Sequence, residues 1–225
     1  MGNFKHRFNA TRPLRIALIG MSGAGKTFWS KCVAECGTPA VCCDDRIEEK
    51  LAPRLKEGGF AGINGVAAWM GWPDSKTYAE REREYLAEET TALDEILSEL
   101  ERDAKRSLVL DTTGSVIYTG NHLLHRLRKL MTVVHLAASD SEEQLLIARY
   151  LSDPKPVLWR GAFQAKAGES PRETVARCYP HLMAARRQSY AALAHVTLPV
   201  AALRELPATG AAFLELLAKS GGGSR

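Results

Sequence analysis

The sequence lacks any long apolar run, and this absence speaks against a membrane-spanning protein. No stretch of its 225 residues approaches the roughly 18 consecutive apolar residues typical of a spanning helix. We also expect no secretory leader, because the first dozen residues are basic and polar and the apolar run 14–20 is too short for the core of a signal peptide. We therefore expect a cytoplasmic protein without a membrane partner.

Cysteine and net charge are also scarce. Among the five cysteines, Cys42 and Cys43 are adjacent and would point to opposite faces of a strand, so we expect reduced thiols rather than a zinc site or disulfides. A formal charge of +4, without an arginine-rich helix, makes nucleic acid an unexpected partner. This mild positive charge is compatible with an anionic substrate.

Short apolar runs alternate with helical patterns along most of the chain. The runs predict strands at 14–19, 39–43, 107–110, 131–137 and 195–200. The periodic patterns predict helices at 26–35, 44–56, 75–102, 122–129, 141–151, 171–194 and 210–219. This alternation favours one α/β domain over 14–219, with a five-stranded parallel sheet and helices on both faces in three layers. A basic tail (1–13) and a flexible Gly/Ser tail (220–225) flank it.

The first expected strand runs directly into a glycine-rich segment that matches G-x-x-x-x-G-K-[ST] at every fixed position. Such a P-loop, or Walker A motif, turns successive N–H groups toward phosphate oxygens at the start of a helix. The candidate nucleotide-binding residues are Gly20, Ser22, Gly23, Ala24, Gly25, Lys26 and Thr27. Lys26 would bridge the β- and γ-phosphates, and the Thr27 hydroxyl would bind Mg²⁺.

A second candidate metal residue is Asp111, which ends the apolar strand Leu108-Val109-Leu110. A carboxylate in this place holds Mg²⁺ through water in P-loop proteins. On its own, a strand-terminal aspartate can equally be a turn former. Because a complete P-loop accompanies it, we favour the metal role.

These residues together resemble the shikimate kinase family, within the nucleoside monophosphate kinase-like group. Asp44-Asp45-Arg46-Ile47-Glu48 is similar to its D-x-D-x-x-I-E motif, which implies that Asp44 orients or deprotonates the acceptor hydroxyl; the alternative is a helix N-cap. The segment 153–158 resembles the lid motif R-P-L-L, with Lys155 in the arginine position. The resemblance further implies that Arg149 stacks on adenine and that Arg186 binds a substrate carboxylate.

The same comparison reveals departures from the family pattern. Tyr78 to Glu82 lies where the family has F-R-x-x-E, so Ala79 replaces a substrate-binding arginine. Thr112 and Thr113 replace glycines of the A-T-G-G-G loop, and Cys42 replaces the first aspartate of the acidic motif. The nucleotide half therefore looks intact, whereas the acceptor half is rebuilt.

We therefore expect a P-loop kinase fold with a substrate-binding lobe at about 44–103 and a lid at about 152–170. The expected activity is ATP- and Mg²⁺-dependent phosphoryl transfer to the hydroxyl of a small anionic molecule other than shikimate, with Lys26, Asp44 and Lys155 in the chemistry. The substrate-binding residues would be Asp44, Thr112, Thr113, Gly114 and Arg186. The resemblance also implies a monomer. The alternative function is a nucleotide-binding switch or ATPase without a small-molecule acceptor.

Overall fold

The computed structural model describes residues 13–152 and 156–221, apart from the side chains of Ile63 and Arg149. Its centre is a sheet of five parallel strands in the order β2-β3-β1-β4-β5. The strands are β1 (Arg15–Ile19), β2 (Ala40–Cys42), β3 (Leu108–Asp111), β4 (Thr132–Ala137) and β5 (Val196–Pro199). Each expected strand is present, and the parallel sheet confirms the predicted fold class.

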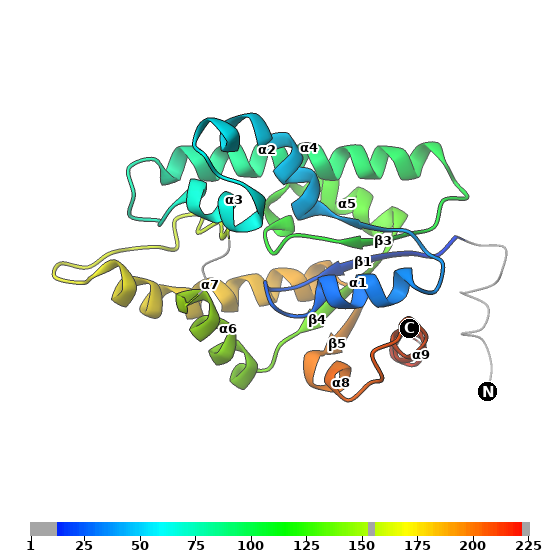
Figure 1. Cartoon of the computed structure of the whole chain (residues 1–225). Helices are drawn as coiled ribbons and strands as arrows, with labels where there is room; N and C mark the ends of the chain where they lie inside the picture. Colours follow the sequence, from blue (N-terminus) through cyan, green and yellow to red (C-terminus); the bar gives the residue numbers. More distant parts are fainter. Residues whose placement is uncertain (1–12, 153–155, 222–225) are drawn as a thin grey trace.

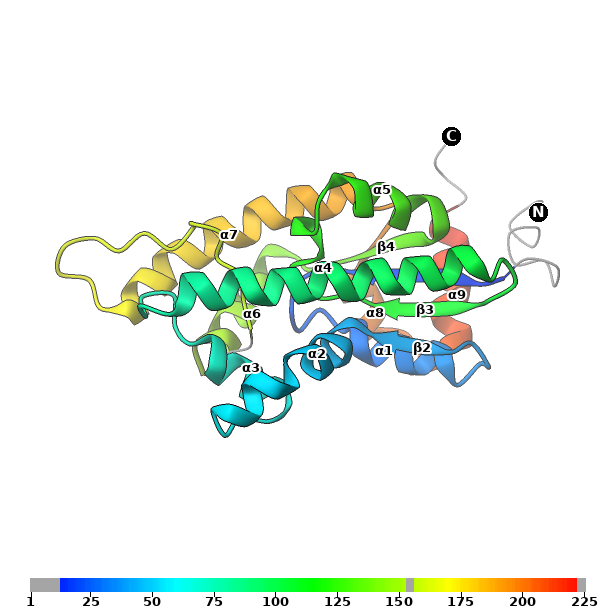
Figure 2. The same cartoon turned by 90° about the horizontal axis from the view of Figure 1, so that it is seen from above.

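Helices cover both faces of this sheet (Figure 1). They are α1 (Lys26–Ala34), α2 (Cys43–Glu57), α3 (Gly62–Met70), α4 (Tyr78–Arg102), α5 (Asn121–Leu130), α6 (Asp140–Ser152), α7 (Pro171–Leu193), α8 (Val200–Arg204) and α9 (Gly210–Ser220), with a 3₁₀ turn at Val116–Tyr118. In Figure 2, α4 lies in front of the strands, α5 and α7 lie to one side of them and α1 to the other, and α8 and α9 lie behind. Helices α4, α5 and α7 pack on one core cluster of the sheet, and α1, α8 and α9 pack on the other. The structure therefore has the three layers expected from the sequence.

Alternation along the strands divides the interior into two cores. In β1, Ala17 and Ile19 belong to the cluster under α2, α4, α5 and α7, whereas Ile16 and Leu18 belong to the cluster with α1, α8 and α9. Successive side chains of a strand point to opposite faces, so a strand that is buried on both faces reads as a continuous apolar run. This explains why short apolar runs located the strands.

Two local features differ from the sequence expectations. The N-cap of α2 is Cys42 and the helix begins at Cys43, so Asp44 lies in the first turn and is not the cap. Helix α8 and the 3₁₀ turn were not predicted, because segments of five and three residues are too short to show a period. In the expected lid, the part from 156 onward begins with buried Val157, Leu158 and Trp159.

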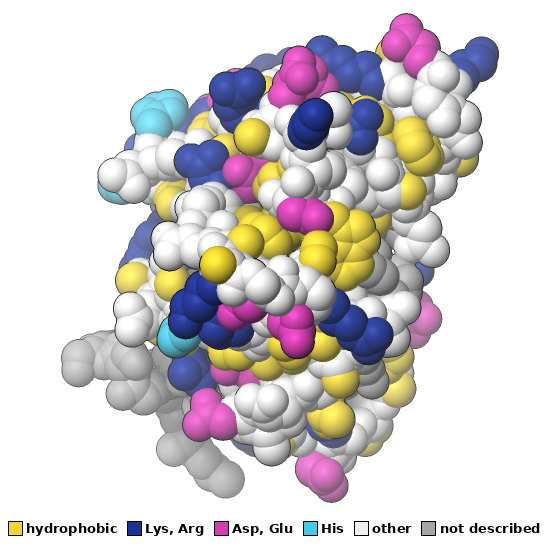
Figure 3. Space-filling view, turned by 90° about the vertical axis from the view of Figure 1, so that its left-hand side faces the viewer, with side chains coloured by type: hydrophobic (Ala, Val, Ile, Leu, Met, Phe, Trp, Pro, Cys, Tyr) yellow, Lys and Arg dark blue, Asp and Glu magenta, His cyan; other side chains and the backbone are white. Residues whose placement is uncertain are grey.

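The strands all point toward one end of the molecule, which is the end where ligands bind in open parallel sheets. Figure 3 views this end and shows hydrophobic side chains gathered in its middle, with charged side chains around them. Among the described helices, none combines the length and the apolar composition needed to cross a membrane.

Candidate active site

The segment Gly20–Thr27 joins β1 to α1 and forms a phosphate-type loop. Gly23 and Gly25 adopt φ of 82° and 96°, in the left-handed region that a residue with a Cβ rarely enters. Gly25 is the N-cap of α1, and in the described chain no side chain caps this helix end. The backbone N–H groups at the start of α1 are thus available to an anion.

Lys26 lies inside the loop that precedes it. Its side chain is buried, and its Nζ donates to the carbonyl oxygens of Gly20 and Met21, each at 3.1 Å. An ammonium group held in a ring of backbone dipoles fits the position of a phosphate-binding lysine. The loop is therefore compatible with a nucleotide phosphate chain.

Helix α6 covers the outer side of this loop. A Cβ on Gly23 would lie 2.8 Å from Leu146 Cδ2, so the loop and α6 are in direct contact at this glycine. A Cβ on Gly20 would lie 2.8 Å from the carbonyl oxygen of Leu136 in β4. At Gly20 the backbone contact and the positive φ both require glycine, whereas at Gly23 the Leu146 side chain can shift and the requirement comes from the positive φ.

The two expected metal residues meet at the end of β3. Thr27 Oγ1 donates to Asp111 Oδ2 at 2.5 Å, and Asp111 is 2% exposed. Burial raises the pKa of Asp111, while the positive charge of Lys26 and the hydrogen bond from Thr27 lower it. These two oxygens are hard ligands of the kind that suit Mg²⁺.

The described residues contain no cluster of three or more His, Cys, Asp or Glu side chains that could hold a metal. An all-protein cage is therefore not available here. Mg²⁺ is generally bound by one or two protein ligands together with phosphates and water, so the pair Thr27 and Asp111 fits this cation in the presence of a nucleotide.

Asp44 faces the phosphate loop from the first turn of α2. Its carboxylate is partly exposed, and Oδ1 accepts a hydrogen bond of 3.1 Å from the hydroxyl of Tyr85 on α4. Burial among neighbouring groups raises the pKa of Asp44, whereas Lys26 and the hydrogen bond from Tyr85 lower it. A carboxylate with these neighbours can accept a proton from a hydroxyl group beside the loop.

A cavity of ≈ 180 Å³ lies between these elements, and we call it the central cavity. It brings together the phosphate loop, α2, α4, the loop after β3 and α7. Its lining residues are Met21, Ser22, Lys26, Asp44, Tyr85, Thr113, Gly114, Ser115, Pro156, Val157, Tyr179 and Arg186. The predicted residues Ser22, Lys26, Asp44, Thr113, Gly114 and Arg186 therefore surround one space.

Arg186 of α7 is a second cation in the lining of this cavity. It is 3% exposed, and its guanidinium donates to the carbonyl oxygens of Leu158 at 2.7 Å and Gly114 at 3.2 Å. The group also lies over the ring of Tyr118 at 5.3 Å. Within the described structure its Nε has no hydrogen-bond partner.

The 112–115 loop uses its hydroxyl groups inside the protein. Thr112 is fully buried and donates to the carbonyl oxygen of Leu18 at 2.8 Å, so it is a structural residue and does not line the central cavity. Thr113 donates to Glu89 Oε1, and Ser115 donates to Glu89 Oε2 at 2.6 Å. The expectation that both threonine hydroxyls recognise the acceptor is not what this geometry favours.

Glu89 is a buried residue of the site that the sequence analysis missed. It is 2% exposed, and burial raises its pKa to about 7, against the lowering effect of the hydrogen bonds from Ser115 and Thr113. A signal was available, because Tyr85-Leu86-Ala87-Glu88-Glu89 has the same aromatic-to-glutamate spacing as F-R-x-x-E. In this register, Leu86 stands in the arginine position.

The register proposed from the sequence, Tyr78 to Glu82, lies outside the cavity. Ala79 is exposed, and the nearby Arg81 donates to the carbonyl oxygen of Trp69 on another surface. Whether the F-R-x-x-E motif is aligned from Tyr78 or from Tyr85, the position of its arginine is occupied by an apolar residue, Ala79 or Leu86. Two other predicted residues cannot be placed, since Lys155 and the side chain of Arg149 lie outside the described residues.

No family model matches the chain, and no curated protein matches it either. Solved structures do. The shikimate kinase from Acinetobacter baumannii in complex with shikimate is 26% identical, with a TM-score of 0.57, over 92% of this chain and 93% of that one. The shikimate kinase from Bacteroides thetaiotaomicron is 19% identical, with a TM-score of 0.51, over 83% of this chain and 86% of that one. The shikimate kinase from Aquifex aeolicus is 16% identical, with a TM-score of 0.53, over 92% of this chain and 95% of that one.

The last two likenesses concern the fold alone, because their identities are low. The phosphate loop and the likeness to the Acinetobacter enzyme identify the chain as a P-loop kinase. Within that class it is shikimate kinase-like, and it is a small-molecule kinase.

Proposed function

We propose that the protein transfers the γ-phosphoryl group of Mg-ATP to a hydroxyl group of a small anionic molecule other than shikimate. The observation that carries this proposal is the central cavity, where Lys26, Asp44 and Arg186 line one space. These side chains offer a phosphate ligand, a proton acceptor and an anion ligand, which are the parts that phosphoryl transfer to an anionic alcohol requires.

In the proposed reaction, Asp44 accepts the proton of the acceptor hydroxyl as that oxygen attacks the γ-phosphorus. The bond from the γ-phosphorus to the bridging oxygen breaks, and ADP leaves with the electron pair. Lys26 stabilises the negative charge on the transferring group from the phosphate-loop side. Bound Mg²⁺ would be held by Thr27 and Asp111 and would neutralise charge on the β- and γ-phosphates.

We propose an acceptor other than shikimate because of the cationic groups that line the cavity. Of its described lining residues, Arg186 is the single arginine, and a leucine or an alanine stands where the family carries a second one. Losing a bidentate arginine typically costs several kcal/mol in binding a carboxylate. An acceptor whose anionic group is bound by a single arginine therefore fits this cavity better than shikimate.

The test is ADP release from Mg-ATP in the presence of shikimate, other hydroxylated acids, sugars, nucleosides and nucleoside monophosphates. We expect one of the hydroxylated acids to raise the rate, and shikimate to do so weakly or not at all. Tight nucleotide binding with a slow rate that no compound raises would replace this proposal with a nucleotide-binding switch or ATPase.

Two variants test the assigned roles directly. Lys26→Ala should weaken Mg-ADP binding in titration calorimetry by tenfold or more, because the main phosphate cation is lost. Asp44→Asn should leave Mg-ADP affinity within about twofold and reduce turnover by about 10² or more. Full turnover in Asp44→Asn would mean that Asp44 has only a structural role.

A further inference from the structure

One face of α4 carries buried polar side chains where a core-facing helix normally carries apolar ones. Tyr78, Glu82, Tyr85 and Glu89 follow a helical spacing and are 6%, 8%, 2% and 2% exposed. Burying a carboxylate is costly unless it is hydrogen-bonded, so each buried glutamate of α4 is expected to have hydrogen-bond donors on the segment that packs against it. We call these four residues the polar face of α4.

The first half of the polar face holds the segment that follows residue 155. The Tyr78 hydroxyl donates to the carbonyl oxygen of Val157 at 2.6 Å and accepts from the Trp159 N–H at 3.0 Å. Glu82 accepts from the Arg160 N–H at 2.8 Å. This part of the helix fixes the outer wall of the central cavity.

The second half of the polar face holds the 112–115 loop. Glu89 accepts one hydrogen bond from Thr113 and one from Ser115, and the Ser115 N–H donates to Thr113 Oγ1 at 3.2 Å. Two of the loop's hydroxyl groups are thus bound to a single carboxylate of α4. The substitution of family glycines by threonines has supplied one of these two anchors.

The opposite side of the loop is fixed by α7. The carbonyl oxygen of Gly114 accepts hydrogen bonds from Arg186 and from the hydroxyl of Tyr190. A Cβ on Gly114 would lie 3.6 Å from the backbone nitrogen of Ser22, so this residue also abuts the phosphate loop. A displacement of the loop would therefore change its separation from the phosphate-binding groups.

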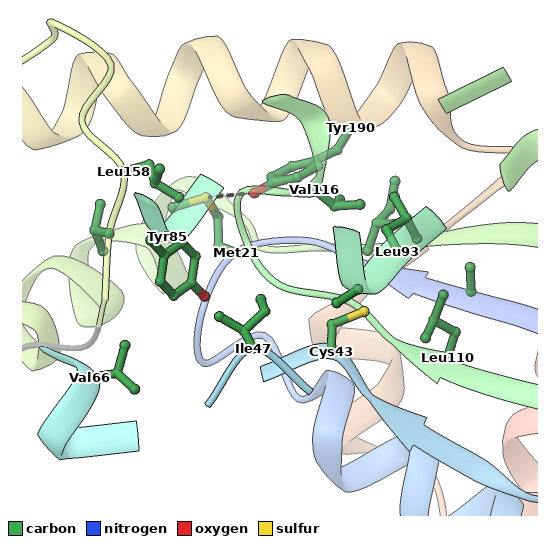
Figure 4. Close-up of a cluster of buried hydrophobic side chains, with 14 of the residues drawn as sticks. Met21, Cys43, Ile47, Val66, Tyr85, Leu93, Leu110, Val116, Leu158 and Tyr190 are labelled. Atoms are coloured by element: carbon green, nitrogen blue, oxygen red, sulfur yellow. Dashed lines mark hydrogen bonds between the residues drawn. The ribbon is translucent and has the colours of Figure 1, made fainter. Parts of the chain in front are cut away.

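Tyr85, one turn before Glu89, holds the proposed proton acceptor. Figure 4 shows its ring near Met21, with the hydroxyl directed to the side on which Ile47 and Cys43 of α2 lie. This hydroxyl donates to Asp44 Oδ1 at 3.1 Å. The F-R-x-x-E motif has phenylalanine at this position, so the hydroxyl is an addition of this chain.

We propose that Tyr85 and Glu89 are positioning residues, which hold Asp44 and the 112–115 loop at a fixed separation by binding both to one rigid helix. This inference rests on the proposed function, because it assigns Asp44 to the acceptor hydroxyl. An acceptor seated against the loop then meets a carboxylate whose distance and orientation are set by α4. Pre-organisation of this kind avoids reordering cost during the reaction.

The first experiment measures hydrogen–deuterium exchange in the Mg-ADP complex and needs no acceptor. Glu89→Gln keeps the shape of the side chain but replaces one of the two oxygens that accept hydrogen bonds from Thr113 and Ser115. Ser115→Ala removes the hydroxyl group that donates to Glu89. Both should speed exchange of the peptide 112–119 by up to about tenfold, the equivalent of one hydrogen bond, and leave α1 unchanged. The control is Glu88→Gln, on the adjacent half-buried glutamate. Exchange equal to wild type in both test variants would overturn the role of Glu89.

The second experiment records the pH profile of ADP release for Tyr85→Phe, with the panel compound that raises the wild-type rate or, if none does, with water as acceptor. The charged groups around Asp44 are Lys26, Asp45 and Asp111, and none of them is changed. Loss of the Tyr85 hydrogen bond should move the acid limb upward by about one pH unit or less and lower kcat by up to about tenfold, with little change in KM for ATP. If Tyr85 had only a structural role, the acid limb of the pH profile would be at the same pH in Tyr85→Phe as in wild type.

The two failures can be told apart with Asp44→Asn. If that variant keeps full turnover, the proposed role of Asp44 is wrong, and the exchange experiment still decides whether Glu89 binds the loop. If Asp44→Asn is inactive but Tyr85→Phe has the wild-type profile and kcat, the proposed function stands and the positioning role of Tyr85 is refuted.

Discussion

The buried carboxyl group of Glu89 should make stability depend on pH in a direction opposite to that of an ordinary ion-paired glutamate. Its pKa is raised from 4.5 to about 7, chiefly by burial. The folded state therefore binds the proton more tightly than the unfolded state. The stabilisation is complete below pH 4.5 and is lost as the pH rises through about 7.

The size of this effect follows from the two pKa values. Each pKa unit is worth about 1.36 kcal/mol, so the full effect is about 3 kcal/mol, most of which falls between pH 5 and pH 8. Glu89→Gln removes the titrating group and keeps a polar side chain of similar shape. Compared with wild type, the variant should therefore gain about 2–3 kcal/mol in relative stability when the pH is raised from 5 to 8.

Urea unfolding at pH 5 and pH 8 measures this quantity. Asp44 and Asp111 also have raised pKa values and contribute to the pH dependence of both proteins, so only the difference between wild type and variant is informative. Glu88→Gln, on the neighbouring half-buried glutamate, should show no such change. A difference between wild type and Glu89→Gln that is the same at both pH values would refute the reasoning.

Two further predictions concern other parts of the molecule. Gly210→Ala should lower the free energy of unfolding by about 1–3 kcal/mol or more in thermal or urea unfolding, because the new Cβ would collide with the backbone of α1, including Val33 Cα at 2.7 Å. Arg186→Lys should raise KM for the acceptor by about tenfold or more and leave Mg-ADP affinity within about twofold, because lysine lacks the planar fork that Arg186 uses for Leu158, Gly114 and an anion. Unchanged acceptor KM would remove Arg186 from the acceptor site.

The phosphate-binding half of the site could be predicted from the sequence because its parts are close along the chain. Strand β1, the glycines and α1 are contiguous, and the pattern of the loop implies the backbone geometry directly. Asp111 was found because it ends an apolar strand, and the parallel pairing of Leu18 with Asp111 then places it beside the loop. Features whose residues are close along the chain can be recognised in a single sequence.

The acceptor half could not be predicted in the same way. The contacts of Glu89 join residues 24 and 26 positions apart, and the contacts of Arg186 reach back 72 and 28 positions. Glutamate on a helix usually lies on the solvent-exposed face, so the sequence of α4 gives no direct sign that Glu89 is buried. Only the packing of α4 against the 112–115 loop shows that this glutamate is buried.

The separation between local and long-range construction explains how such a kinase can keep its nucleotide site while its acceptor site is rebuilt. The backbone of the phosphate loop supplies most of the nucleotide contacts, so few side chains there can change without loss of binding. The acceptor cavity is instead a meeting of side chains from α2, α4, α7 and the 112–115 loop. Loss of the family arginine removes one ligand for the acceptor, while Thr113 and Ser115 attach the loop to Glu89 instead. Under the proposed function, the order of the loop would not depend on a bound carboxylate, and Arg186 and Asp44 would recognise the acceptor.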